Sequence, residues 1–152
     1  MTTISRTFQT FINAKPETVF AYVADLTKHS EWNSGLVIEA VTPGPIQVGS
    51  QYRSRGVVLN QKDRPNELRV TQYEPITRFG FASQDPDFKE VTHDFTFSPQ
   101  SSGTLLSRTF TVNLPPLVAF GFSTFIFPFV GKPSMEKSHA MLKSKLEQTA
   151  TQ

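Results

Sequence analysis

The chain has 152 residues, 14 of them Phe and none of them Cys, and its formal net charge is +2 at pH 7. A chain of this length typically forms one domain whose core is large enough to be stable without disulfides or a bound metal. We therefore expect a single domain over residues 1–152. The lack of Cys excludes disulfides, Cys-ligated zinc and thiol catalysis. Lys and Arg are scattered along the sequence, which argues against a nucleic-acid partner. Residues 1–6 have neither the basic nor the apolar region of a signal peptide, so we expect a cytoplasmic location.

A strand and two short helices are predicted at the start of the chain. Residues 3–13 alternate loosely between apolar and polar and favour a strand. Pro16 occupies the helix position that tolerates proline best, so it begins a helix. The apolar side chains of this helix recur at three- and four-residue spacing: Val19, Phe20, Val23 and Leu26. We expect Thr27 to cap a second helical turn that ends at Trp32.

Six further strands are predicted after these helices, separated by short polar or Pro-containing segments. They cover residues 36–41, 51–59, 68–73, 78–82, 91–97 and 104–113. Residues 61–66 favour a hairpin loop, and residues 85–87 and 99–103 favour turns. Short connections of this kind indicate an antiparallel meander. The last predicted element is a helix over residues 134–147, which would cover one face of the sheet. Its apolar face holds Met135, His139, Leu142 and Leu146.

The start of the chain resembles the polyketide cyclase/dehydrase-like families of the START-like (SRPBCC, Bet v 1-like) superfamily. The matching positions are Ala14, Pro16, Val19, Phe20, Asp25 and Trp32, followed in order by Gly49-x-x-Tyr52, Tyr73-Glu74-Pro75 and Gly103-Thr104. The resemblance implies an α+β helix-grip fold. In that fold a curved antiparallel sheet of about seven strands wraps around a C-terminal helix, with two short helices after the first strand. It also implies a cavity between the sheet and this helix, although the superfamily places many activities on one scaffold.

The segment Leu114–Val130 is the most apolar part of the chain and holds five Phe between positions 120 and 129. A membrane span is a poor interpretation, because the segment is short and contains three Pro. One interpretation is a helical turn or two that extends the last helix across the sheet edge. The resembling families often have one long helix here, but Pro128, Gly131 and Pro133 predict a break. The alternative is a mobile lid or an exposed apolar patch for a ligand, a membrane surface or a second subunit.

Strand alternation places polar side chains on otherwise apolar faces. His93 lies among Phe95 and its apolar neighbours, Arg108 shares a face with Phe110, and His139 is on the apolar face of the last helix. Together they would suit one acidic or hydroxylated ligand head, with Arg108 pairing an anion and His93 exchanging a proton. Alternatively, each His is an ordinary hydrogen-bonded core residue, and Arg108 leaves through a strand end or a bulge.

The predicted ligand-binding residues lie on the inward faces of these elements. They are Trp32, Tyr52, Ser54, Gly56, Phe79, Phe81, His93, Phe95, Arg108, Phe110, Phe120 and His139. Gly56 is expected to leave room beneath its strand. Trp32 is either a core plug for the short helix or a wall of the cavity entrance, and the neighbouring His29 is expected at the surface.

No Walker loop, Rossmann fingerprint, H-E-x-x-H or EF-hand pattern occurs, and the three His lie on separate elements. We therefore expect no metal and no cofactor. The first hypothesis is a non-enzymatic carrier or sensor of a small apolar or aromatic molecule, such as a lipid, a quinone or a polyketide-like compound. The second is a cyclase/dehydratase-type enzyme that uses His93 and Arg108 without a metal or a covalent nucleophile. The third is a membrane or protein contact module that uses residues 114–130. Monomer and homodimer both stay open.

Overall fold

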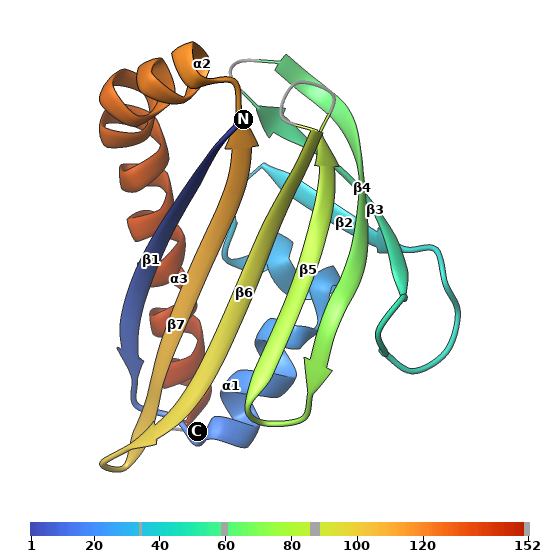
Figure 1. Ribbon diagram of the computed structural model, residues 1–152. Coiled ribbons are helices and arrows are strands. Elements are labelled where there is room, and N and C mark those ends of the chain that lie inside the picture. The colour runs from blue at the N-terminus through green and yellow to red at the C-terminus, as the bar shows by residue number, and fades with distance from the viewer. Residues whose placement is uncertain (34, 59–60, 86–88, 151–152) are drawn as a thin grey trace.

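The chain folds into seven strands and a set of helices in the order shown in Figure 1, a computed structural model that describes residues 1–33, 35–58, 61–85 and 89–150. The N-terminal half contains β1 (Thr2–Ile12), α1 (Pro16–Ala24), the 3₁₀ helix η1 (Leu26–Glu31), β2 (Leu36–Ala40), β3 (Gln51–Val58) and β4 (Gln61–Glu74). The C-terminal half contains β5 (Arg78–Asp85), β6 (Lys89–Gln100), β7 (Gly103–Leu114), α2 (Pro116–Gly121), the π-helical segment η2 (Phe122–Gly131) and α3 (Lys132–Ala150).

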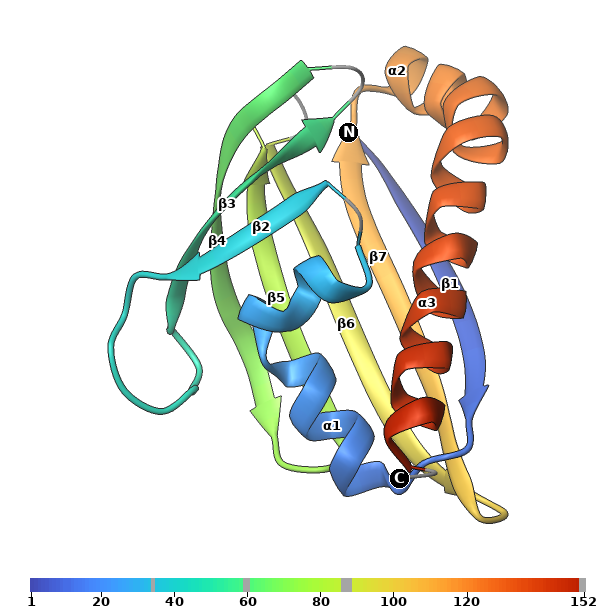
Figure 2. The ribbon, with the colours of Figure 1, turned by 180° about the vertical axis from the view of Figure 1, so that it is seen from behind.

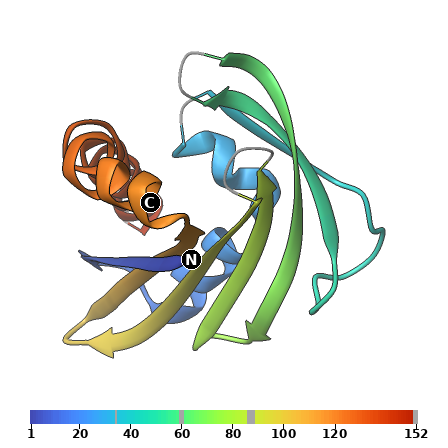
Figure 3. The same ribbon diagram turned by 45° about the horizontal axis from the view of Figure 1, so that its top comes forward.

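The strands form one antiparallel sheet in the order β1-β7-β6-β5-β4-β3-β2. The helices α1, η1 and α3 all lie on the same face of this sheet (Figure 2). Figure 3 shows that the sheet curves strongly around them. The predicted α+β helix-grip fold, with two short helices after the first strand and a long C-terminal helix, is therefore confirmed.

A bulge in β4 contributes to this curvature. Val70 pairs with Phe81 and Gln72 pairs with Gly80, so Thr71 is one extra residue in β4. A bulge bends its strand and increases the local twist. The bend carries the far end of the sheet, β2 to β4, over the helix η1, as the view in Figure 3 shows.

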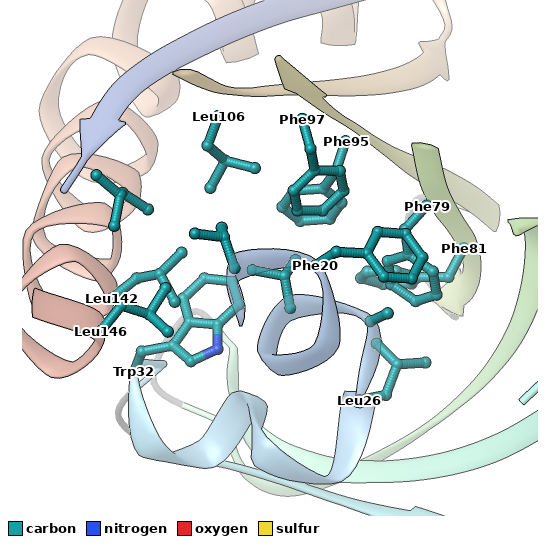
Figure 4. Close-up of a cluster of buried hydrophobic side chains, with 14 of the residues drawn as sticks. Phe20, Leu26, Trp32, Phe79, Phe81, Phe95, Phe97, Leu106, Leu142 and Leu146 are labelled. Atoms are coloured by element: carbon teal, nitrogen blue, oxygen red, sulfur yellow. The ribbon is translucent and has the colours of Figure 1, made fainter. Parts of the chain in front are cut away.

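The core on the concave face consists of two clusters. The larger one joins α1, η1 and the C-terminal end of α3 to the middle of the sheet, and Figure 4 shows its aromatic centre. Its fully buried members include Trp32, Phe79, Phe95 and Leu142. The smaller cluster joins β1, β7, α2 and η2 through Ile4, Phe110, Val112, Leu114, Ala119 and Phe127. The apolar faces predicted from helical and strand periodicity are therefore the buried ones.

Two local predictions in the first half of the chain are wrong. Residues 61–66 belong to β4 and not to a hairpin loop, because the polar residues there occupy the outer end of a long paired strand. The cap of η1 is Asp25 and not Thr27: a side-chain oxygen of Asp25 accepts a hydrogen bond from the Thr27 backbone N–H at 3.1 Å. A carboxylate at this position satisfies a backbone donor that the helix leaves free.

The predicted break before the last helix is also wrong. α2, η2 and α3 follow one another without an interruption, and Lys132, between Gly131 and Pro133, has ordinary helical dihedrals (φ −60°, ψ −50°). Pro128 lies inside the π-helical segment. The wider π turn bonds i to i+5, so a residue without an N–H is accommodated more easily than in a regular α-helix. Residues 116–130 of the predicted apolar segment are thus a helical extension of α3, and Leu114 ends β7.

Candidate functional site

A pocket of about 240 Å³ opens on the concave face, between η1 and the strands β2 to β7. Its polar lining consists of His29, Asn33, Ser54, Asn66, Ser83, His93 and Arg108. Its apolar wall consists of Leu36, Ile38, Leu68 and Phe81. None of the described residues of α3 lines it, so the cavity expected between the sheet and the C-terminal helix lies nearer to η1 and β2.

Among the described residues, Arg108 is the one Arg or Lys side chain that lines this pocket. Its side chain is 5% exposed, and its Nη2 donates a hydrogen bond to His93 Nδ1 at 3.2 Å. The guanidinium carbon lies 5.3 Å from the ring centre of Phe95 and 5.7 Å from that of Trp32. Such contacts between a cation and aromatic faces hold the side chain inward. The predicted inward register of Arg108 is confirmed, and the alternative in which it leaves the sheet is not.

The charge on Arg108 is not neutralised within the described part of the chain. Its Nε and Nη1 are buried without a hydrogen-bond partner, and no described carboxylate forms an ion pair with it. Burial lowers the pKa of Arg108 to about 10, so the group still carries its proton at neutral pH. The carbonyl oxygen of the Asn66 side chain and the indole N–H of Trp32 are likewise buried and unpaired. Buried polar groups are nearly always satisfied in folded proteins, so this concentration is unusual.

His93 is the partner that Arg108 does have. Because Nδ1 accepts the hydrogen bond from Arg108, the neutral ring carries its proton on Nε2. Burial, then the charge of Arg108 and then His29, hold the pKa of His93 well below its usual range. The imidazole stacks on Phe81 at 4.9 Å between ring centres. His93 is therefore a neutral group that can donate from Nε2 but does not add positive charge.

His29 was expected at the surface, and this expectation is wrong: its side chain is 1% exposed and lines the pocket. Its Nε2 donates to the Val23 carbonyl at 2.7 Å, and its ring lies 4.6 Å from that of Trp32. Burial is the main cause that lowers the pKa of His29 to about 4. A signal for its position exists in the sequence, because Leu26, His29 and Trp32 recur every three residues and share one face of a 3₁₀ helix.

His139 does not join Arg108 and His93. It lies between α3 and β1, where its Nδ1 and the Thr10 hydroxyl are 2.9 Å apart and its ring meets the edge of Phe8. Burial, with a smaller effect of Arg108, lowers the pKa of His139 to about 4. A separate depression of about 320 Å³ borders this residue between β1 and α3. The predicted convergence of Arg108, His93 and His139 is therefore wrong for His139, and the third polar group beside Arg108 and His93 is His29, which was not predicted there.

The remaining predicted ligand-binding residues are distributed around the pocket or away from it. Ser54 and Phe81 line it, and Trp32 and Phe95 flank Arg108. Phe79 is in the core, Phe110 lies with its ring centre 6.4 Å from that of His93, and Tyr52 borders another depression, of about 180 Å³, among surface Arg and Glu side chains. A Cβ at Gly56 would meet Gly35 O at 3.0 Å, so the room expected there is filled by the neighbouring strand. Phe120 is 65% exposed and lies outside the pocket.

Nothing in the described part of the chain gathers three or more His, Asp or Glu side chains in a way that could hold a metal ion. The site is instead a partly aromatic pocket with one buried cation, neutral imidazoles and free hydrogen-bonding groups. In combination with the curved sheet and its helices, it defines a helix-grip protein with a pocket on the concave face of its sheet.

Sequence comparison agrees with this class. Residues 1–147 match the family described as polyketide cyclase / dehydrase and lipid transport. The chain belongs to this family, which is part of the SRPBCC, or Bet v 1-like, group. The resemblance noted from the sequence is confirmed. No curated protein matches the chain.

Solved structures match the fold over nearly the whole chain. A protein of unknown function from Staphylococcus aureus, SA2116, is 12% identical, with a TM-score of 0.77 over 99% of this chain and 98% of that one. Ara h 8.0201 is 11% identical, with a TM-score of 0.67 over 95% and 98%. The di-domain ARO/CYC BexL from the BE-7585A biosynthetic pathway is 16% identical, with a TM-score of 0.72 over 95% of this chain and 50% of that one. At these identities the likeness concerns the fold alone.

Proposed function

We propose that the protein binds and carries a small molecule with an apolar or aromatic body and an acidic head, and that the head pairs with Arg108. The observation that supports this proposal is the buried guanidinium, whose Nε and Nη1 have no hydrogen-bond partner among the described residues. An unpaired buried charge is costly, and a bound carboxylate, phenolate or enolate would offset that cost. Charge-assisted hydrogen bonds to guanidinium are among the strongest that proteins form.

The rest of the pocket suits the body of such a molecule. Leu36, Ile38, Leu68 and Phe81 form an apolar wall, while Asn66 and the serines can orient a few polar substituents. Small-molecule sites usually combine a mostly apolar lining with a few well-placed polar groups. Burial of apolar ligand surface contributes about 25 cal/mol per Å² before the cost of association. A volume of about 240 Å³ favours a compact aromatic compound, such as a quinone-like or polyketide-like ring, over a long lipid chain.

The test compares two probes that differ only in the head, cinnamic acid and cinnamyl alcohol. Binding is measured by calorimetry and by the fluorescence of Trp32, which is the only Trp in the chain and lies 5.7 Å from the Arg108 guanidinium. We expect the acid to bind at least about tenfold more tightly than the alcohol, because a charge-assisted hydrogen bond contributes about 1.5–3 kcal/mol.

Two variants locate the preference. Arg108→Met should abolish the tenfold preference and leave the affinity for the alcohol nearly unchanged, whereas Arg108→Lys should keep part of it. Arg6→Met removes a cation that lies over Phe127, outside the pocket, and should change neither affinity. Equal affinities for acid and alcohol in the unmodified protein would refute the acidic head. Organic extraction and mass spectrometry of the purified protein would then identify the natural ligand.

The contact between Arg108 and His93 supports a second candidate, an enzyme of the cyclase/dehydratase type. Arg108 and the Nε2–H of His93 would both donate hydrogen bonds to the developing enolate oxygen, while a water molecule takes the α-proton. The test is exchange of the α-protons of acetylacetone with deuterated water, followed by NMR. An enzyme would accelerate the exchange, and His93→Ala would remove the acceleration while cinnamic acid still binds. No acceleration by the unmodified protein would refute this role.

A further inference from the structure

The helical segment α2–η2, residues 116–131, exposes many apolar side chains. They lie outside the pocket, so a ligand bound there would not account for their exposure. Seven of them are at least one-third exposed: Leu117, Val118, Phe120, Phe125, Ile126, Phe129 and Val130. Three of the seven are Phe, with exposed fractions of 62% to 76%. Monomeric proteins rarely leave a large contiguous apolar patch in water unless the patch binds something. Figure 1 shows this segment at one end of the molecule, beside the N-terminus.

The exposed face is held in place by an inner face. Ala119 and Phe127 are buried in the smaller core cluster, and Phe122 packs against the same cluster. The Phe127 ring lies 5.7 Å from Phe110 and 6.1 Å from Phe8. The segment is therefore anchored to β1 and β7 from below, and its outer side chains are presented as a surface of defined shape.

Charged side chains lie beside this surface but not within it. Residues 114–131 contain no Asp, Glu, Lys or Arg. At its border, the Arg6 guanidinium lies 5.4 Å from the Phe127 ring centre, and Lys132 and Lys137 occupy the first two turns of α3. Glu136, 3.9 Å from Lys132, is the acidic member of this rim. The rim is therefore net positive around an apolar centre.

We propose that this face of residues 116–131 docks on the surface of an anionic lipid bilayer. The exposed Phe, Leu and Val side chains would enter the boundary between head groups and acyl chains, while Arg6, Lys132 and Lys137 pair with lipid phosphates. Helices with one apolar face rich in Phe and Leu and a basic rim bind membranes in this way, by apolar burial and attraction to anionic lipids. The proposal does not depend on the pocket or on its ligand.

Two other occupants fit the observations less well. By length and composition, the continuous helix Pro116–Gln148 is apolar enough to cross a membrane, but Ala119 and Phe127 of its apolar part are buried in the smaller core cluster. A second copy of the chain, placed by a two-fold axis, would bring the same rim against itself. The rims of the two copies carry the same net positive charge and would repel each other, whereas an anionic bilayer attracts such a rim.

The test is co-sedimentation of the full chain with vesicles of phosphatidylcholine mixed with phosphatidylglycerol, compared with vesicles of phosphatidylcholine alone. We expect binding to the anionic vesicles that weakens as salt is added. The triple variant Phe120→Ser/Phe125→Ser/Phe129→Ser should lower the partition coefficient by about tenfold or more, because each buried CH₂ group contributes about 0.8 kcal/mol. Lys132→Glu should weaken binding to a smaller extent and only to the anionic vesicles.

The matched control is Val37→Ser/Val41→Ser/Val48→Ser, which removes three exposed apolar side chains from the β2 region and the loop after it. It should leave vesicle binding unchanged, as should Arg108→Met. Circular dichroism and thermal unfolding establish that each variant folds. No binding to the anionic vesicles, or an equal loss in the control, would overturn the proposal. So would a dimer in analytical ultracentrifugation that the Phe variant dissociates, since the surface would then serve a second copy.

Discussion

The pocket and the α2–η2 segment depart from the ordinary distribution of side chains in opposite directions. In the pocket, a charged guanidinium is 5% exposed and lacks partners for two of its nitrogens. In the segment, Phe120, Phe125 and Phe129 are exposed although the core of the domain is built from the same residue type. A buried polar group and a large exposed apolar patch are the two informative exceptions to the rule that apolar residues lie inside.

The two regions need different kinds of partner, one that pairs a buried charge and one that covers exposed apolar side chains. Arg108 needs an acceptor small enough to enter a pocket of about 240 Å³. The Phe side chains need a broad apolar phase, because they lie along several turns of helix. Neither requirement is met within the described part of the chain, and the two call for partners of different kinds. Substitutions can separate the residues that stabilise the fold from the residues that would bind a partner.

The largest effect is expected within the segment itself. Phe127→Ala should destabilise the protein by about 3 kcal/mol, because Phe127 is 8% exposed and its ring fills the smaller core cluster. Phe129→Ala, two residues away and 76% exposed, should change stability by no more than about 0.5 kcal/mol. Urea unfolding of both variants measures the difference. Similar losses would mean that the outer face is part of the core.

Acidification should destabilise the protein through the buried imidazoles. His29 has a pKa of about 4 in the folded chain, below its value of 6.5 when unfolded, so the unfolded chain binds the proton first as pH falls. The stabilisation is complete above pH 6.5 and is lost between pH 6.5 and 4. For His29 alone we expect a loss of about 2 kcal/mol at pH 5 relative to pH 7.5.

The variant His29→Gln tests this assignment, because Gln keeps an N–H donor for the Val23 carbonyl but does not titrate. Its stability should fall less steeply over the same pH range, as measured by urea unfolding at each pH. An unchanged slope would show that His29 is not a source of the effect. His93 and His139, whose pKa values are also lowered mainly by burial, supply the slope that remains.

The smallest effect has the opposite sign. Arg108→Met should stabilise the ligand-free protein by about 1–2 kcal/mol, because an apolar side chain of similar length replaces a buried charge that lacks an ion-pair partner. Thermal unfolding of the ligand-free protein measures this. If the variant is more stable and also loses the preference for acids, Arg108 lowers the stability of the fold but provides ligand binding. A destabilised variant would instead show that the guanidinium supports the fold.

Most of the fold could be predicted from the sequence, because strict alternation in β6 and the Pro16 helix start are local signals that tertiary structure did not override. The strand over residues 61–66 could not, because its residues are polar and include Pro65 and Asn66, which favour turns, although they pair with β3. The continuous helix around Pro128 could not either, because a π turn leaves no recognisable pattern in the residues.

For the pocket, the sequence predicted the meeting of Arg108 and His93, since alternation on two neighbouring strands places them on the same face. It missed His29, because a titratable side chain predicts exposure, and only the packed structure shows that its ring is buried against Trp32. The misplacement of Phe120 has a different cause. Its apolar character predicts burial, and only the packed structure shows which face of α2 is turned away from the sheet.

The side chain of Phe110 lies between the pocket and the α2–η2 segment. Phe110 contacts Phe122 and Phe127 of the segment on one side, and its ring centre lies 6.4 Å from His93 of the pocket on the other. A shift of this ring on docking would change the wall behind His93, and the affinity for the ligand would change with it. Thermodynamic reciprocity then requires the ligand to change the affinity for the bilayer by the same factor. Binding and release of the ligand would in that case depend on whether the protein is docked on a bilayer.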